Sequence, residues 1–239
     1  MHGNLPALEA VLEDVRRLRC DLVVIGGDFA TGPMPGATIE LLRSLGDQAL
    51  FIRGNSEREL VGWYDGERPE LDASIEGTLR WSAEQITRDQ RDFLAGLPED
   101  VTVAIDGLGA VFFCHATPRS DAEIVTTATP DPAFEGAFAG VQERLVVCGH
   151  THMQFDRVAG ATRVVNAGSV GMPYEGLPGA FWALLGPEVS LRRADYDFGR
   201  AAERVRTSGF PLGADFADEN VLNPPRREEV TALFEGMRG

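Results

Sequence analysis

Four short apolar runs in the first two-thirds of the chain are each followed by a polar side chain. Their length and composition predict buried strands. The runs span residues 21–25, 49–52, 111–114 and 145–148. The polar residues that follow are Asp28, Asn55, His115 and His150, and three of the four come directly after a glycine. Because open α/β sheets place ligand sites outside the carboxyl ends of their strands, we expect these side chains to lie together.

Helical periodicity fills the stretches between these runs. Apolar residues at helical spacing predict a first helix from Leu5 to Leu18, with Asn4 as its N-cap and Pro6 in its first turn. Further helical patterns cover residues 38–45, 72–86 and 87–97, and the last of these opens on a capping box.

Two segments of the central chain are expected to flank a site. Residues 61–99 read as a helical insertion after the Asn55 loop, which either overhangs the site or covers a sheet edge. Residues 117–132 are rich in Pro, Asp and Thr and predict a long loop after His115.

The pattern changes after His152. Residues 162–166, 180–185 and 189–194 predict short strands joined by glycine-containing turns, an antiparallel run that forms part of a second sheet. A helix to Ser208, a Gly/Pro-rich link and a last helix over residues 226–234 complete the chain. We therefore predict a domain over residues 1–196 and a helical extension over residues 197–239. The extension packs on the domain or on a second subunit, so a homodimer stays open.

Composition narrows the classes of protein to consider. The chain of 239 residues is 44% apolar, as expected for a globular protein with a core. Its net charge of −15 disfavours broad nucleic-acid binding. No apolar stretch is long enough to span a membrane, and no signal segment opens the sequence. Cys20, Cys114 and Cys148 read as reduced core residues, which predicts a cytoplasmic protein.

The histidines suggest a metal centre. His2 and His150 lie beside a glycine, His115 ends an apolar run, and His152 follows His150 with one residue between them. In extended backbone, His150 and His152 project to the same side, so both rings can face one volume. Imidazoles combined with carboxylate and amide oxygens suit Mn, Fe, Ni or Zn, and the mixture differs from the cysteine-rich ligands of structural zinc.

A carboxylate among several histidines has a specific use. It can bridge two ions about 3.5–4 Å apart, which polarise phosphoryl oxygens and supply hydroxide at neutral pH. Arg53 and Arg119 are the basic residues that we expect nearest the proposed ligands, and an arginine can hold two phosphoryl oxygens. A solvated surface position is the alternative for each arginine.

Taken in order, these motifs resemble those of the calcineurin-like metallophosphoesterases, and most closely the compact bacterial phosphodiesterase-like group. The motifs are His2-Gly3-Asn4, Gly27-Asp28, Gly54-Asn55, His115 and Gly149-His150-Thr151-His152, and the likeness extends from Met1 to Asp195. It implies a four-layer α/β sandwich of two mixed β-sheets flanked by helices. It also implies two divalent metal ions, with manganese favoured and Fe, Ni or Zn as alternatives.

The resemblance assigns roles to individual residues. Asp28 would bridge the ions and, with Asn55 and His115, carry catalysis. The first ion would also be held by Asn55, His115 and His150, and the second by His2 and His152. Asn4 would lie near the bound phosphate. The implied activity is hydrolysis of phosphodiesters or activated phosphomonoesters in small phosphate esters.

Two departures from the family pattern modify these expectations. The family motif Asp-x-His follows a strand, whereas this sequence begins at Met1-His2. We therefore expect an open position in a sheet and a weak or absent ion at His2 and His152. Many members carry a histidine after the motif asparagine that protonates the leaving alcohol, and Ser56 stands there instead. An alternative function is a catalytically impaired scaffold that binds a protein partner, and the natural substrate stays open.

Overall fold

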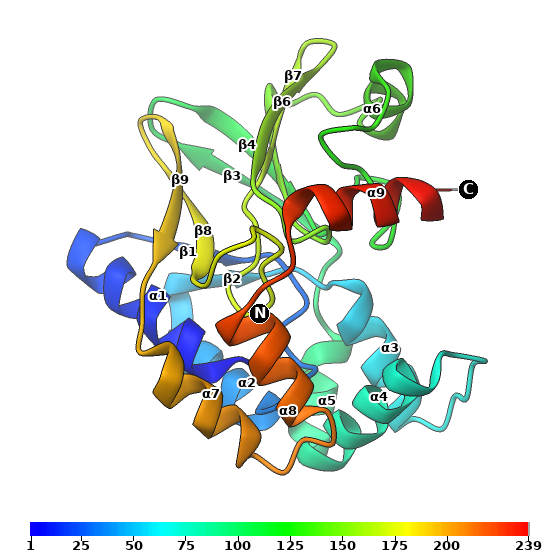
Figure 1. The fold of residues 1–239 in the computed structure, drawn as a ribbon. Coiled ribbons are helices and arrows are strands. Elements are labelled where there is room, and N and C mark those ends of the chain that lie inside the picture. Colours follow the sequence, from blue (N-terminus) through cyan, green and yellow to red (C-terminus); the bar gives the residue numbers. More distant parts are fainter. Residues whose placement is uncertain (239) are drawn as a thin grey trace.

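The computed structural model describes residues 1–238, and its largest element is a mixed five-stranded sheet in the upper half of Figure 1. Strands β4, β5 and β7 run parallel, and β3 and β6 pair antiparallel at the two edges. In sheet order the strands are β3 (Asp100–Ile105), β4 (Gly109–Cys114), β5 (Leu145–Cys148), β7 (Thr162–Asn166) and β6 (Phe155–Ala159).

The remaining strands form two separate pairs. Strand β1 (Val23–Ile25) pairs parallel with β2 (Ala49–Phe51), and β8 (Ala180–Leu185) pairs antiparallel with β9 (Val189–Ala194). The sequence led us to expect a second sheet with one open strand position. Across residues 1–238 no strand joins β1 to β8, so each pair keeps an unpaired outer edge.

Alternation along β4 and β5 builds two cores on the two faces of the large sheet. Phe113 and Val147 pack on one face with Ile52, which follows β2. Cys114 and Val146 point to the other face, where they share a buried cluster with Phe134 of α6 (Asp131–Ala137) and Phe155. This period of two follows from the pleat of a strand. Because β4 and β5 run parallel, His115 and His150, which follow them, lie at the same end of the sheet.

Helices of the first hundred residues cover β1 and β2. They are α1 (Leu5–Leu18), α2 (Pro35–Arg43), α3 (Asn55–Tyr64), α4 (Ala73–Gln85) and α5 (Arg88–Ala95). Their apolar sides share one buried cluster that includes Leu8, Ile25 and Leu60. The predicted caps are confirmed, because Asn4 accepts from the N–H of Ala7 at 3.3 Å and Thr87 closes a capping box.

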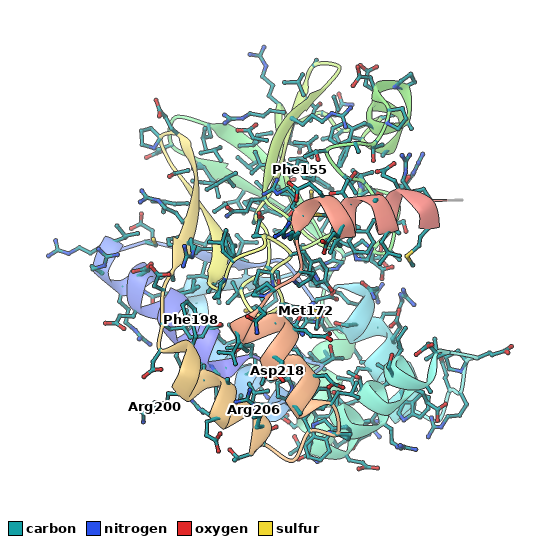
Figure 2. The ribbon with its side chains drawn as sticks, in the orientation of Figure 1. Phe155, Met172, Phe198, Arg200, Arg206 and Asp218 are labelled. Atoms are coloured by element: carbon teal, nitrogen blue, oxygen red, sulfur yellow. The ribbon has the colours of Figure 1, made fainter. Side chains whose placement is uncertain are left out.

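The C-terminal segment has more structure than the predicted link and helix. It comprises α7 (Phe198–Arg206), α8 (Gly213–Phe216), a π-helical turn (Ala217–Leu222) and α9 (Arg227–Met237). Met172 and Phe198 pack against its buried cluster, and an ion pair joins Arg206 to Asp218 (Figure 2). Arg204 of α7 also reaches Glu9 of α1 at 2.7 Å, so this segment is packed on the rest of the chain.

Several elements differ from the sequence expectations. Helix α3 begins at Asn55 itself, so the expected Asn55 loop is a helix N-terminus. Strands β3 and β6 were not predicted, and α6 begins at the end of the predicted loop 117–132. Both missed strands lie at sheet edges, where only every second residue is partly or fully buried; β3 has the matching apolar alternation at Val101, Val103 and Ile105, whereas β6 lacks it.

No helix within residues 1–238 combines the length and apolar character that a membrane crossing requires.

Candidate metal centre

Asp28 lies at the centre of the site, in the turn that follows β1. Its side chain is buried, and its Oδ1 atom accepts hydrogen bonds from the Ser56 backbone N–H at 3.0 Å and the Ser56 hydroxyl at 2.7 Å. Its Oδ2 atom lies 3.2 Å from Nε2 of His115 and 3.7 Å from Nε2 of His2. One oxygen is therefore fixed by the protein, and the other faces the histidines.

Glu57 fixes the turn that carries Asp28. Its fully buried carboxylate accepts hydrogen bonds from four backbone N–H groups. The donors are Asp28 at 2.7 Å, Phe29 at 2.7 Å, Ala30 at 3.0 Å and Gly54 at 2.9 Å. The two motif loops after β1 and β2 are thus joined through a single side chain. Charge-assisted hydrogen bonds of this kind are about twice as strong as neutral ones.

Two glycines allow the loops to approach so closely. A Cβ atom on Gly54 would lie 2.3 Å from Asp28 Oδ1, and a Cβ atom on Gly27 would lie 2.7 Å from His115 Nδ1. Gly27 also has a φ of +87°, which favours glycine. Any side chain at either position would push Asp28 or His115 out of place.

The tautomer of His115 is set by a backbone carbonyl. Its Nδ1 atom lies 2.7 Å from the carbonyl oxygen of Gly26, which can only accept, so Nδ1 carries the hydrogen. Burial alone would lower the pKa of His115 below its usual value. The carboxylate of Asp28 and the hydrogen bond to this carbonyl outweigh burial, and together they raise the pKa to about 9. Without a metal the ring is therefore protonated at pH 7 and its Nε2–H points at Asp28, so an ion bound to Nε2 would have to displace that proton.

His150 and His152 occupy a tight turn after β5. Both residues have left-handed backbone, with φ of 62° and 61°, so the extended backbone that we expected is wrong. Asn166, at the end of β7, fixes the turn by donating to the Gly149 carbonyl at 2.5 Å and the Thr151 hydroxyl at 3.1 Å. The two rings consequently separate, one toward His115 and the other toward His2.

His2 completes the second half of the site. Its backbone N–H donates to the Asp28 carbonyl at 2.7 Å, and its Nε2 atom lies 2.9 Å from Nε2 of His152. Burial, followed by the Met1 ammonium, lowers the pKa of His2 to about 3. Burial and His115 lower the pKa of His150 to about 4, and burial and His2 lower that of His152 well below its usual value. These three rings are therefore neutral at pH 7, the form that binds metal.

These side chains form two groups whose ligand atoms lie within 4.8 Å of one another. One group is Asp28, His115 and His150, and the other is His2, Asp28 and His152. Within residues 1–238, four buried site atoms lack any hydrogen-bond partner. They are Asn55 Oδ1, His115 Nε2, His150 Nδ1 and His152 Nδ1. Buried polar atoms without partners are rare, and a cluster of them fits bound cations.

Backbone strain is concentrated at the same place. Within residues 1–238, five residues other than glycine have positive φ, and four of them are His2, Asp28, His150 and His152. Such conformations cost of order 1–3 kcal/mol each and persist only when the surrounding structure enforces them. The fold therefore holds the site in a conformation that its sequence does not favour locally.

Asn55, Asn4 and the two arginines hold different positions around this centre. Asn55 is the first residue of α3 and donates from Nδ2 to Glu59 at 3.3 Å, which leaves Oδ1 free for a ligand. Asn4 donates to the Gly171 carbonyl and caps α1, so both of its polar atoms are engaged.

Arg53 pairs with Glu99 at 2.5 Å, and Arg119 pairs with Glu123. Substrate contacts of Asn4, Arg53 and Arg119 stay predictions.

Sequence reasoning missed Glu57 and the role of Ser56. The spacing of Gly54 and Glu57 is that of an N-cap and its third helical residue, which could have identified Glu57 as a capping side chain. It also missed an ion pair beside the site, in which Arg58 of α3 contacts Asp121 at 2.8 Å and 3.0 Å. No local pattern in the sequence indicates that pairing.

Comparison with known proteins identifies the family. The calcineurin-like phosphoesterase superfamily domain matches residues 1–185, and the chain therefore belongs to this superfamily. Among solved structures, the hypothetical protein PH1004 from Pyrococcus horikoshii OT3 is 22% identical with a TM-score of 0.80. That match covers 94% of this chain and 96% of the other. No curated protein matches the sequence.

A second structure adds sequence likeness. The metallophosphoesterase from Sphaerobacter thermophilus is 25% identical with a TM-score of 0.68, over 91% of this chain and 93% of that one. The chain thus has an α/β metallophosphoesterase-like fold with a mixed sheet flanked by helices. The family resemblance expected from the sequence motifs is confirmed.

The Glu57 contacts predict a large effect of a small change. Glu57→Gln replaces an acceptor oxygen by an amide donor that faces backbone donors, so we expect a loss of about 3 kcal/mol in the free energy of unfolding. Urea denaturation measures it, with exposed Glu76→Gln as a control that stays within about 0.5 kcal/mol of the parent. An unchanged stability for Glu57→Gln would contradict the role given to this carboxylate.

The two ligand groups predict unequal metal binding. Both groups share the one carboxylate of Asp28, and the family resemblance adds the free Oδ1 of Asn55 to the group with His150 alone. After dialysis against metal-free buffer, we expect one bound ion per chain by mass spectrometry. His150→Ala should remove that ion and His152→Ala should retain it. Two fully occupied ions per chain without added metal would contradict this inequality.

Proposed function

We propose that this chain is a metal-dependent phosphoesterase that hydrolyses phosphodiesters or activated phosphomonoesters. The observation that supports it best is the convergence of four histidines on one buried carboxylate, with several ligand atoms left without partners. Divalent ions bound there would polarise a phosphoryl group and lower the pKa of water. The same geometry has no evident structural purpose, because it destabilises the fold through strained backbone conformations and through buried polar atoms without hydrogen-bond partners.

The roles of the side chains follow from their contacts. Asp28 presents Oδ2 to both groups of histidines, so it would bridge two ions. The hydrogen bond from the Ser56 hydroxyl to Oδ1 of Asp28 fixes the orientation of the carboxylate. Asn55, His115 and His150 would hold one ion, and His2 and His152 the other. Glu57 positions the bridging residue through the backbone. Catalytic roles for Asp28, Asn55 and His115 belong to this proposal.

Further features belong to the same proposal. Manganese is the favoured ion on the family resemblance, and the mixture of imidazole and oxygen ligands also suits Fe, Ni or Zn. Residues 1–196 would form the metallophosphoesterase domain, and residues 197–239 an extension packed on it. The two short strand pairs would together form the second sheet of a four-layer sandwich. A cytoplasmic location fits the three free cysteines.

A turnover assay with Mn²⁺ and bis-p-nitrophenyl phosphate tests the proposal. We expect metal-dependent hydrolysis that falls by at least about 10²-fold in Asp28→Asn. Asp131→Asn, whose side chain is 86% exposed, is a matched control that keeps full activity. A folded chain that binds Mn²⁺ but turns over no phosphate ester would contradict the proposal and favour the alternative, a scaffold that binds a protein partner.

The surroundings of Ser56 predict which esters react. Ser56 is buried and donates its hydroxyl hydrogen to Asp28, so it does not protonate a leaving alcohol. Without a general acid, worth about 10²–10⁴-fold, the rate should fall steeply as the leaving-group pKa rises. A series of substituted phenyl and alkyl esters measures this slope. Alkyl phosphomonoesters such as phosphoserine cleaved as fast as p-nitrophenyl diesters would contradict it.

A further inference from the structure

An ion pair joins two of the segments that carry the proposed metal ligands. Arg58, in the first turn of α3, contacts Asp121 in the loop that follows His115. The contact is bidentate, because Nε and Nη2 of Arg58 donate to different carboxylate oxygens at 2.8 Å and 3.0 Å. The Asp121 side chain is 20% exposed and that of Arg58 is 44% exposed, so solvent still reaches the pair. The roles proposed above for the site residues leave this ion pair without one.

Two sets of contacts place the pair beside the proposed metal centre. On α3, Nη2 of Arg58 lies 3.7 Å from Oε1 of Glu59, and the same oxygen accepts from Nδ2 of Asn55 at 3.3 Å. On the loop side, burial lowers the pKa of His150, and the carboxylate of Asp121 is close enough to the ring to act against it. A phosphoryl group bound at the ions would therefore lie within the range of about 8–10 Å over which unscreened charges act.

Local hydrogen bonds fix the position of Asp121. Thr117 and Ser120 pair through their backbones, with N–H to carbonyl distances of 3.0 Å and 3.3 Å. The Ser120 hydroxyl also accepts from the N–H of Ala122 at 3.2 Å. This tight turn holds Asp121 at a set place relative to His115, so the charge opposite Arg58 is part of the folded loop.

The two other arginines considered near the site are paired in the same way. The sequence contains no lysine, so arginine supplies every permanently cationic side chain. Ion pairs join Arg53 to Glu99 and Arg119 to Glu123. With Arg58 and Asp121 these pairs carry no net charge. None of the three arginines is left to neutralise a second negative charge on a substrate.

Both partners of the central pair are ionised at neutral pH. The hydrogen bond from Arg58 lowers the pKa of Asp121 below its usual value, and the same bond raises the pKa of Arg58. A phosphomonoester has a second pKa of about 6 and carries two charges at pH 8, whereas a diester carries one. An unpaired arginine would attract the dianion about twice as strongly as the monoanion, and the carboxylate cancels that advantage.

We propose that Asp121 is a specificity-determining residue, which neutralises Arg58 beside the metal centre and thereby favours phosphodiesters with one negative charge over monoesters with two. This inference rests on the proposed phosphoesterase function and narrows its substrate class. Asp121 acts through Arg58 and has no catalytic role. The effect is separate from that of Ser56, which concerns how the leaving group departs.

Methyl phosphate and dimethyl phosphate are matched probes, because they differ by one methyl group and one negative charge. Their dissociation constants from the Mn²⁺-loaded protein are measured by calorimetry at about pH 8. Asp121→Asn keeps the size of the side chain and removes its charge. We expect the affinity for methyl phosphate, relative to that for dimethyl phosphate, to rise at least about fivefold. Salt at about 1 M should reduce this gain, because it screens exposed charges.

Two further variants separate charge from structure. Arg58→Gln combined with Asp121→Asn removes both charges, so the affinity ratio should return to within about twofold of the parent value. Glu9→Gln is a matched control, because Glu9 of α1 makes a bidentate contact with Arg204 of α7 at 2.7 Å and 3.1 Å. That substitution should leave the ratio unchanged.

Three results would overturn the inference. A parental affinity ratio in Asp121→Asn would mean that the charge of Arg58 does not act on the ligand. A raised ratio that persists in the double variant would mean that a changed loop shape is responsible. Failure of the Mn²⁺-loaded parent to bind either ester is the third. The affinities need no turnover, so hydrolysis of bis-p-nitrophenyl phosphate by the parent tests the proposed function separately.

Discussion

The four hydrogen bonds accepted by Glu57 are the interaction on which the site depends. They tie the turn after β1 to the first turn of α3, two segments that are far apart in sequence. With that turn fixed, Asp28 holds a left-handed backbone conformation and aims one oxygen at the histidines. A buried carboxylate is costly unless it is fully hydrogen-bonded, so the same contacts that position Asp28 also make Glu57 tolerable.

The general placement of the site could be read from the sequence because it follows from strand polarity. Parallel strands that end at one edge deliver their following residues to one place, and Asp28, Asn55, His115 and His150 obey that rule. Asn4 was likewise expected as an N-cap, and the structure shows that bond. Both inferences rest on local patterns, which a single sequence contains.

Features that depend on long-range contacts could not be read in this way. The left-handed conformations of His150 and His152 are enforced by Asn166 on a neighbouring strand, and no residue near the histidines indicates them. Strand β3, in contrast, carries a local signal that was overlooked, since Val101, Val103 and Ile105 alternate as in a half-buried strand. The spacing of Gly54 and Glu57 indicates at most a helix cap, because three of the four donors to Glu57 come from the turn after β1, which is distant in sequence.

Sheet alternation places sulfur directly behind the site. Cys114 precedes His115, and Cys148 lies two residues before His150, yet both thiols face the apolar core beneath the sheet. Burial raises the pKa of Cys148 to about 12, which keeps its thiol protonated. A one-residue slip of β4 would bring Cys114 to the place of His115 and turn its thiol to the opposite face. Strand register thus decides whether an imidazole or the softer thiol faces the proposed metal centre at this position.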